Sequence, residues 1–183
     1  MHISAPKYFF ISINLYSKVF LFFYSMPKYR LLSIEELQEL EKEFVNYLIL
    51  NGIAAEDWDK LKVEDIDAAD KILELFSDVV FEKIFRKVEF LDYISPKEIR
   101  TFQCLNEKIV LVGIKTSSEG SVDFTDPNYI QKVLANPSEN FKIYSTEKKY
   151  NKVREQELFE MTKMGCVISD GRLFKAICMA FPK

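Results

Sequence analysis

The stretch IRTFQCLNEKIVLVGIK, residues 99–115, contains two runs of β-branched and aromatic residues. Leu105, Asn106 and Glu107 separate the two runs. Runs of this composition, joined by a few polar residues, are typical of two antiparallel strands and their turn. The stretch therefore predicts a β-hairpin, and it marks the point where the chain changes from helical to strand periodicity.

The residues before this hairpin have the pattern of helices. Ser33 and Glu36 have the spacing of a capping box, in which each side chain bonds the backbone N–H of the other residue. Apolar residues then recur at helical spacing until Asn51-Gly52, a typical helix end. These apolar positions are Leu37, Leu40, Phe44 and Leu48. One helix is expected here, followed by a short helix or turn around Trp58.

A long helix is expected from about Asp67 until Ser95-Pro96, because apolar residues continue at helical spacing as far as Leu91 and proline disfavours helix at the residue before it. Its apolar stripe is wide enough to pack against more than one neighbour.

Short strands and helices are expected after the hairpin. The stretch 121–137 reads as a short strand and then a helix that begins at Asp126-Pro127. FKIYST, residues 141–146, and CVIS, residues 166–169, read as strands, with a helix from Val153 to Met164 between them. Residues 170–181 fit either a hairpin strand, with Asp170-Gly171 as its turn, or a helix.

Together these elements predict an α+β protein, with a helical N-terminal half packed on a small, mostly antiparallel sheet with further short helices. Residues 26–183 are expected to form a single α+β domain, since that length suffices for one core.

Composition narrows the classes of function. The net charge of the chain is −3, so no general nucleic-acid binding is expected, because such proteins carry a basic stripe. The three cysteines, Cys104, Cys166 and Cys178, are odd in number and form no C-x-x-C pair. Unpaired thiols suit a reducing compartment, which favours the cytoplasm.

Residues 1–25 differ from the rest of the chain. Their apolar runs are broken by Ser17-Lys18 and are followed by no cleavage site of small residues, so they make a poor signal peptide or membrane span. Of these 25 residues, 20 are Phe, Ile, Lys, Asn, Tyr, Leu or Ser, all encodable by A/T-rich codons. The preferred interpretation is a non-native or disordered leader with the true start at Met26. A membrane anchor is the next alternative, although membrane association is not favoured.

Many familiar catalytic motifs are missing from the sequence. The only histidine, His2, lies in the leader, so the domain lacks the residues for Ser-His-Asp or Cys-His catalysis and for histidine-bound zinc. The five glycines form neither a dinucleotide-binding nor a P-loop motif. No cofactor and no metal are expected.

Carboxylates give the best remaining catalytic hypothesis. Asp123 and Asp126 lie at an expected helix start, and Lys142 lies near the start of a later strand. Two acids and a lysine have the chemistry to hold Mg²⁺ and position a phosphate ester. The favoured alternative is structural, with Asp126 as a helix cap and Asp123 as a polar strand residue.

Two clusters suggest a surface for a partner. Phe76, Phe81 and Phe85 lie close together on the long expected helix, where they form either core or an exposed docking surface. Lys148, Lys149 and Tyr150 belong to a second cluster that mixes bases and aromatic rings. Its other members are Tyr144, Lys152 and Arg154.

Three segments carry a resemblance to a known family. YRLLSIEELQELEKEFVNYLILNGI, FSDVVFEKIFRKVEFL and MTKMGCVISDGRLFKAI resemble the matching segments of an uncharacterised bacterial protein family, a domain of unknown function. The resemblance covers about residues 28–181 and implies no activity and no functional residue. The leading hypothesis is therefore a non-catalytic cytoplasmic interaction or regulatory module, with a protein partner or a homodimer. Alternatives are a metal-dependent enzyme acting on phosphate esters, and a membrane-associated protein anchored by residues 1–25.

Overall fold

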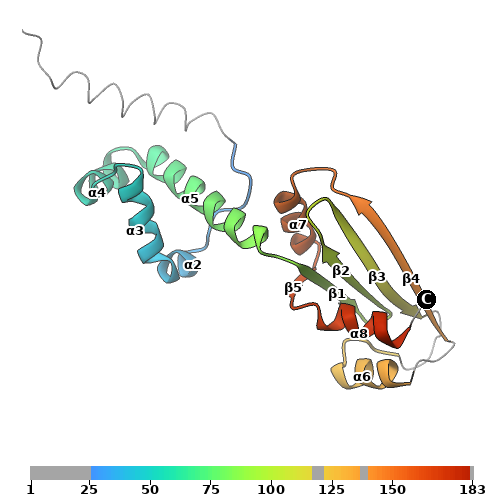
Figure 1. The fold of residues 1–183 in the computed structure, drawn as a ribbon. Helices are drawn as coiled ribbons and strands as arrows, with labels where there is room; N and C mark the ends of the chain where they lie inside the picture. Colours follow the sequence, from blue (N-terminus) through green and yellow to red (C-terminus); the bar gives the residue numbers. More distant parts are fainter. Residues whose placement is uncertain (1–25, 117–121, 137–139, 182–183) are drawn as a thin grey trace, which may run out of the picture. The chain divides into compact units, whose positions relative to one another are not determined.

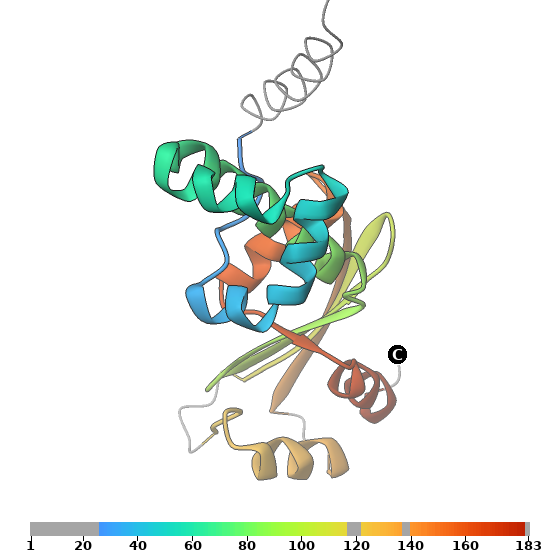
Figure 2. The ribbon, with the colours of Figure 1, turned by 90° about the vertical axis from the view of Figure 1, so that its left-hand side faces the viewer.

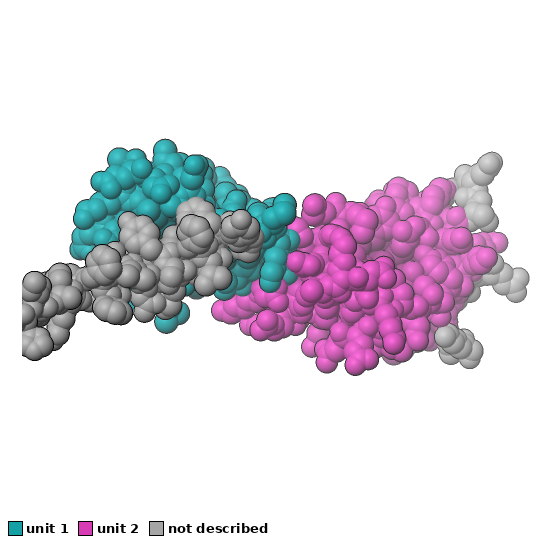
Figure 3. All heavy atoms as spheres, turned by 90° about the horizontal axis from the view of Figure 1, so that it is seen from above, with its two compact units in different colours: residues 1–81 teal, residues 82–183 magenta. Residues whose placement is uncertain are grey.

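The computed structural model describes residues 26–116, 122–136 and 140–181, and the leader lies outside these ranges. The described residues form seven helices and five strands, which confirms the α+β class. The chain divides into two compact units, one ending at Phe81 and the other beginning at Glu82 (Figure 3). Helix α5 (Ile66–Arg86) runs through this boundary. The sequence also predicted that the helical half packs on the sheet and that residues 26–183 form a single domain. Both statements remain predictions.

The first unit is helical (Figure 1), with α2 (Ile34–Glu39), α3 (Glu41–Leu50), α4 (Ala55–Glu64) and most of α5. Ser33 and Glu36 form the expected capping box. The single helix expected after Ser33 is wrong in one respect, because Leu40 leaves the helical conformation and separates α2 from α3.

Aromatic rings fill the core of the helical unit. The ring centroid of Phe44 lies 5.0 Å from that of Phe76 and 5.2 Å from that of Trp58. The segment that precedes α2 is tied to α5, since the Asp78 carboxylate accepts hydrogen bonds of 3.0 Å from the backbone N–H groups of Lys28 and Tyr29. The chain just after Met26 is therefore part of this unit.

The second unit is built on a five-stranded antiparallel sheet with the order β4-β3-β2-β1-β5. The predicted hairpin is confirmed as β2 (Glu98–Cys104) and β3 (Lys108–Thr116). The strands predicted on either side of the helix at residues 153–164 are confirmed as β4 (Phe141–Lys149) and β5 (Val167–Ser169).

Strand β1 (Phe90–Ser95) corrects the sequence prediction, which continued the long helix to Ser95. Val88 and Leu91 have helical spacing, but β1 pairs with β2 on one side and with β5 on the other. Pairing with two neighbours decides the conformation here, because strand formation depends on partners distant in the sequence. The short strand expected near residue 122 is also wrong for the described residues, where Phe124 and Thr125 form a turn ahead of α6 (Pro127–Ala135).

The two faces of the sheet are covered by different helices (Figures 1 and 2). On one face, the side chains of α6 (Pro127–Ala135) and α8 (Arg172–Ala180) pack with those of the strands around Ile114, which is fully buried. On the other face lies α7 (Arg154–Lys163), with Leu158 fully buried. The strand residues alternate between these two faces, as the pleat requires.

Gly171 decides the ambiguity at residues 170–181 in favour of the helix α8. It precedes the helix with a φ of 76°, a left-handed conformation that glycine adopts without strain. A Cβ atom on Gly171 would lie 2.5 Å from the ring of Phe90 on β1. The glycine therefore opens the helix and also lets the turn pack closely on the sheet.

We expect Gly171→Ala to lower the free energy of unfolding by at least about 2 kcal/mol, because it combines left-handed strain with overpacking. Gly52→Ala is the matched control, since Gly52 has a φ of 75° and no atom within 4 Å of its Cβ position. Its cost should be about 1 kcal/mol, from the backbone alone. Denaturant titration followed by circular dichroism measures both, and equal costs would contradict the role of the Phe90 contact.

Candidate functional site

Arg154, at the start of α7, ties three other backbone segments of the sheet unit to this helix. Its guanidinium donates hydrogen bonds to the carbonyls of Phe85 at 2.9 Å, Cys104 at 3.0 Å and Leu105 at 3.2 Å, and also to that of Val88. Its side chain is 13% exposed. A buried guanidinium that donates to carbonyls of this kind has a structural role, because the fork of donors matches several fixed acceptors.

The cavity next to Arg154 has a volume of about 580 Å³ and lies beside the β2–β3 turn. Cys104 lines it, and burial raises the pKa of its thiol to about 12. A thiol is nucleophilic only as the thiolate, so Cys104 is not an activated nucleophile. Nearby, Tyr150 donates a 2.8 Å hydrogen bond to the Leu105 carbonyl, and burial raises the pKa of this phenol to about 12.

We expect Arg154→Gln to destabilise the sheet unit by about 2–4 kcal/mol, because several buried carbonyls lose their donor. Arg154→Lys should restore little of this loss, since one ammonium lacks the geometry of the fork. Lys152→Met, which removes an exposed ion pair to Glu160, is the control and should cost less than about 1 kcal/mol. Thermal and denaturant unfolding measure the loss of stability in each variant. If Arg154→Gln loses less stability than Lys152→Met, the structural role of Arg154 is contradicted.

A second cavity, which we call the α7 groove, lies between α7 and the sheet and has a volume of about 450 Å³. The sheet contributes Tyr93, Arg100, Phe102 and Lys148, the α7 side contributes Asn151, Lys152, Glu157, Glu160, Met161 and Met164, and Cys166 comes from the approach to β5. The groove thus combines apolar side chains with a charged rim. Met164 is 69% exposed, so apolar atoms of the groove remain accessible to a ligand.

The charges of the groove are arranged in pairs. Lys148 contacts Glu157, and the Lys152 ammonium lies 2.5 Å from a carboxylate oxygen of Glu160. Burial opposes ionisation of Glu157, but hydrogen bonds from Lys148 and from the backbone of Asn151 lower its pKa on balance. Each pair joins one basic and one acidic side chain, so the rim that they form has no formal net charge.

Arg100 is held at the other end of the α7 groove. It contacts Glu98 and lies over the ring of Tyr93, with 5.4 Å between the guanidinium carbon and the ring centroid. Tyr144 donates a 2.7 Å hydrogen bond to Glu98, and its ring lies over Gly113, where any Cβ atom would clash with it. Glycine at position 113 thus lets an aromatic ring lie against the sheet next to the groove.

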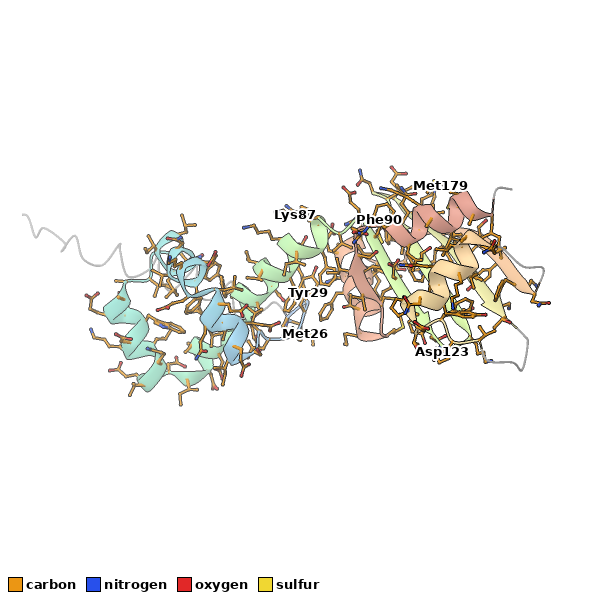
Figure 4. All side chains as sticks on the ribbon, turned by 90° about the horizontal axis from the view of Figure 1, so that it is seen from below. Met26, Tyr29, Lys87, Phe90, Asp123 and Met179 are labelled. Carbon is orange, nitrogen blue, oxygen red and sulfur yellow. The ribbon has the colours of Figure 1, made fainter. Side chains whose placement is uncertain are left out.

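The residues proposed from sequence for metal-dependent catalysis are not gathered in one pocket among the described residues. Asp126 caps α6 by accepting a 2.9 Å hydrogen bond from the backbone N–H of Asn128. Asp123 accepts two hydrogen bonds from Thr125, and Figure 4 shows it near the start of α6. Phe141 packs in the core under α6, so the next residue, Lys142, points to the opposite face of the sheet. These placements match the structural alternative for Asp126.

Metal ligands are also not clustered in the part of the chain that the structure describes, where no three His, Cys, Asp or Glu side chains come together. Within the same residues, no helix combines the length and the apolar character needed to cross a membrane.

The residues proposed from sequence as a docking surface lie in different environments in the structure. Phe76, Phe81 and Phe85 are only 2%, 7% and 4% exposed, so they are core residues and do not form an accessible surface. Lys148 belongs to the rim of the α7 groove, Tyr150 is held by Leu105, and Lys149 is exposed on β4. Sequence reasoning missed Arg100, Phe102, Met161 and Met164 in the groove, because no local motif links positions from distant elements.

Comparison with known proteins identifies a family but no function. The model of a family of unknown function (DUF6495) matches residues 26–181. The chain belongs to this family. No curated protein and no solved structure matches the chain.

The charge of this DUF6495 protein is distributed unevenly. Residues 26–81, in the helical unit, contain 6 basic and 14 acidic residues, whereas residues 82–183, in the sheet unit, contain 17 basic and 14 acidic residues. The small net charge of the whole chain therefore hides an acidic unit and a mildly basic one.

Asp92, on β1, has a carboxylate whose burial is only partly compensated by hydrogen bonds. Its Oδ1 atom is buried and has no hydrogen-bond partner in the described part of the chain. Burial raises the pKa of Asp92, and the nearby charge of Asp170 adds to the rise, while a hydrogen bond from Ser169 opposes it. The charged form of Asp92 is therefore less favourable in the folded state than in the unfolded chain.

This predicts a pH-dependent effect of Asp92→Asn. Because the folded-state pKa is raised, Asp92 contributes stability below its unfolded pKa, and this stability is lost as the pH rises through the folded value. The free energy of unfolding of Asp92→Asn, taken relative to that of the wild type, should therefore be highest at neutral pH and lowest in acid. Denaturant unfolding of both proteins at several pH values measures the difference. A difference that does not change with pH would contradict the prediction.

Proposed function

We propose that this protein is a non-catalytic interaction module of the cytoplasm, and that it binds a partner protein through the α7 groove. The observation that carries the proposal is the groove itself, in which apolar side chains remain accessible while the neighbouring charged groups are already paired. The free thiols Cys104, Cys166 and Cys178 suit the reducing conditions of the cytoplasm.

The chemistry of the groove favours binding over catalysis. Burial raises the pKa of Cys166, which lines the groove, so this thiol is not activated. Glu157, the buried acid of the groove, has a lowered pKa and is held by Lys148, so it is a poor proton donor at neutral pH. A general acid or base needs a pKa near the working pH, and these two groups lack it.

The partner that fits is a protein segment with one apolar anchor side chain and little net charge. Met164, which is exposed, is a flexible apolar side chain that adapts to an anchor of varied shape, whereas Met161 is buried. The paired rim of Lys148 with Glu157 and Lys152 with Glu160 offers polar contacts around the anchor, as the polar rim of protein interfaces does. A strongly charged segment would instead have to break these pairs.

We expect Met164→Glu in the full chain to reduce binding of the partner at least about tenfold, because it places a charge where the apolar anchor would lie. Met179→Glu is the matched control, since Met179 is 75% exposed and lies on α8 (Figure 4). Affinity capture from cells that express the protein, with quantification of each captured protein, compares wild type with the two variants.

The proposal requires a protein that is captured by wild type and by Met179→Glu but lost with Met164→Glu. If the two variants capture the same proteins in the same amounts, the α7 groove is not the binding site. Circular dichroism and the fluorescence of Trp58, the only tryptophan, verify that each variant is folded.

A further inference from the structure

Strand β5 forms one edge of the sheet and carries exposed apolar side chains. It pairs with β1 alone, through the positions Phe90 to Asp92. Val167 is 67% exposed and Ile168 is 47% exposed. An exposed apolar edge strand is a template for pairing with another chain, since its outward backbone groups and its side chains both favour a further strand.

The opposite edge of the same sheet is protected. Strand β4 has nine residues, and Lys142, Lys148 and Lys149 are all exposed on it. Lysines on an edge strand oppose edge-to-edge association. If two copies of β4 paired antiparallel about Ser145, Lys142 of each copy would lie opposite Lys148 of the other. This edge is therefore unsuited to self-association, although it is the longer of the two.

The β5 edge lacks such protection. The stretch from Met164 to Ser169 contains no charged residue. In a symmetric antiparallel pairing about Ile168, Val167 would lie opposite Ser169, and Cys166 opposite Asp170, so no like charges would meet. The β5 edge is thus compatible with a second copy of itself, whereas β4 is not.

An apolar hollow continues this surface. A cavity of about 410 Å³ lies beside β5. Its apolar lining residues are Ile84, Val88, Phe90 and Ile168, and its polar lining residues are Lys87, Glu89, Ser169 and Asp170. Ile84, near the end of α5, is 42% exposed. The strand edge and the hollow together give a second copy both backbone hydrogen bonds and apolar area to bury.

We propose that two copies of this protein associate through β5, with the two strands antiparallel about a twofold axis near Ile168, so that their sheets become one continuous sheet. The residues Val167 and Ile168 supply the contact, and the hollow beside Ile84 accepts apolar side chains of the other copy. Because β5 has only three residues, the interface is small and the dimer is weak, with a dissociation constant of about micromolar order. This association is independent of partner binding in the α7 groove.

Val167→Lys tests the proposal, because it gives β5 the kind of protection that β4 already has. We expect it to raise the dissociation constant of the dimer at least about tenfold, measured by light scattering and sedimentation over a range of concentrations. Ile143→Lys is the matched control, since Ile143 lies on the protected edge and is 36% exposed. It should leave the dissociation constant unchanged.

Hydrogen exchange of the wild-type full chain gives a second readout that needs no variant. The β5 amides that point away from β1 should exchange more slowly at high than at low protein concentration, while those of β4 should not change. A protein that stays monomeric at every concentration overturns the proposal. So does a dimer that Ile143→Lys disrupts and Val167→Lys leaves intact.

Discussion

The sheet unit depends on one buried arginine. Arg154 donates to carbonyls at the end of α5, at the approach to β1 and at the β2–β3 turn, and thereby fixes three separate segments to the start of α7. These carbonyls lie at or near the ends of elements, where few backbone donors remain. The Phe85 carbonyl also accepts from the backbone N–H of Val88, and the Leu105 carbonyl also accepts from Tyr150. The guanidinium is the donor that all four carbonyls share, and it fixes the position of α7. The α7 groove exists because α7 is held in that position over the sheet.

Several polar side chains of the described residues form hydrogen bonds or ion pairs that support the fold. Asp126 caps a helix, Glu157 is paired with Lys148, and Asp78 holds the chain ahead of α2. The thiol of Cys104 is buried, which keeps it protonated. Exposed apolar side chains include Met164 in the groove and Val167 and Ile168 on the β5 edge. Accessible apolar side chains beside satisfied charges favour binding to other proteins.

Much of the fold was predictable from local signals, and the exceptions have a common cause. The capping box at Ser33, the hairpin around Asn106 and the helix opened by Asp126 each depend on residues within a few positions of one another. Strand β1 was missed because its residues have helical spacing and become a strand only by pairing with β2 and β5. The groove was missed for a similar reason, since Arg100 and Met164 are far apart in the sequence. The basic cluster around Lys148 was noticed, but its pairing with Glu157 was not foreseeable.

The sequence by itself determined the α+β class, the family and most of the caps and turns, because these follow from periodicity and from contacts between near neighbours. Only the tertiary structure decided that Phe76, Phe81 and Phe85 are core, that Arg154 is a buried tie and that β5 is an apolar edge. Burial and pairing are properties of residues distant along the chain. In the sequence, a basic or aromatic side chain can be interpreted as an exposed binding residue. Its actual role depends on the neighbours that the fold places around it.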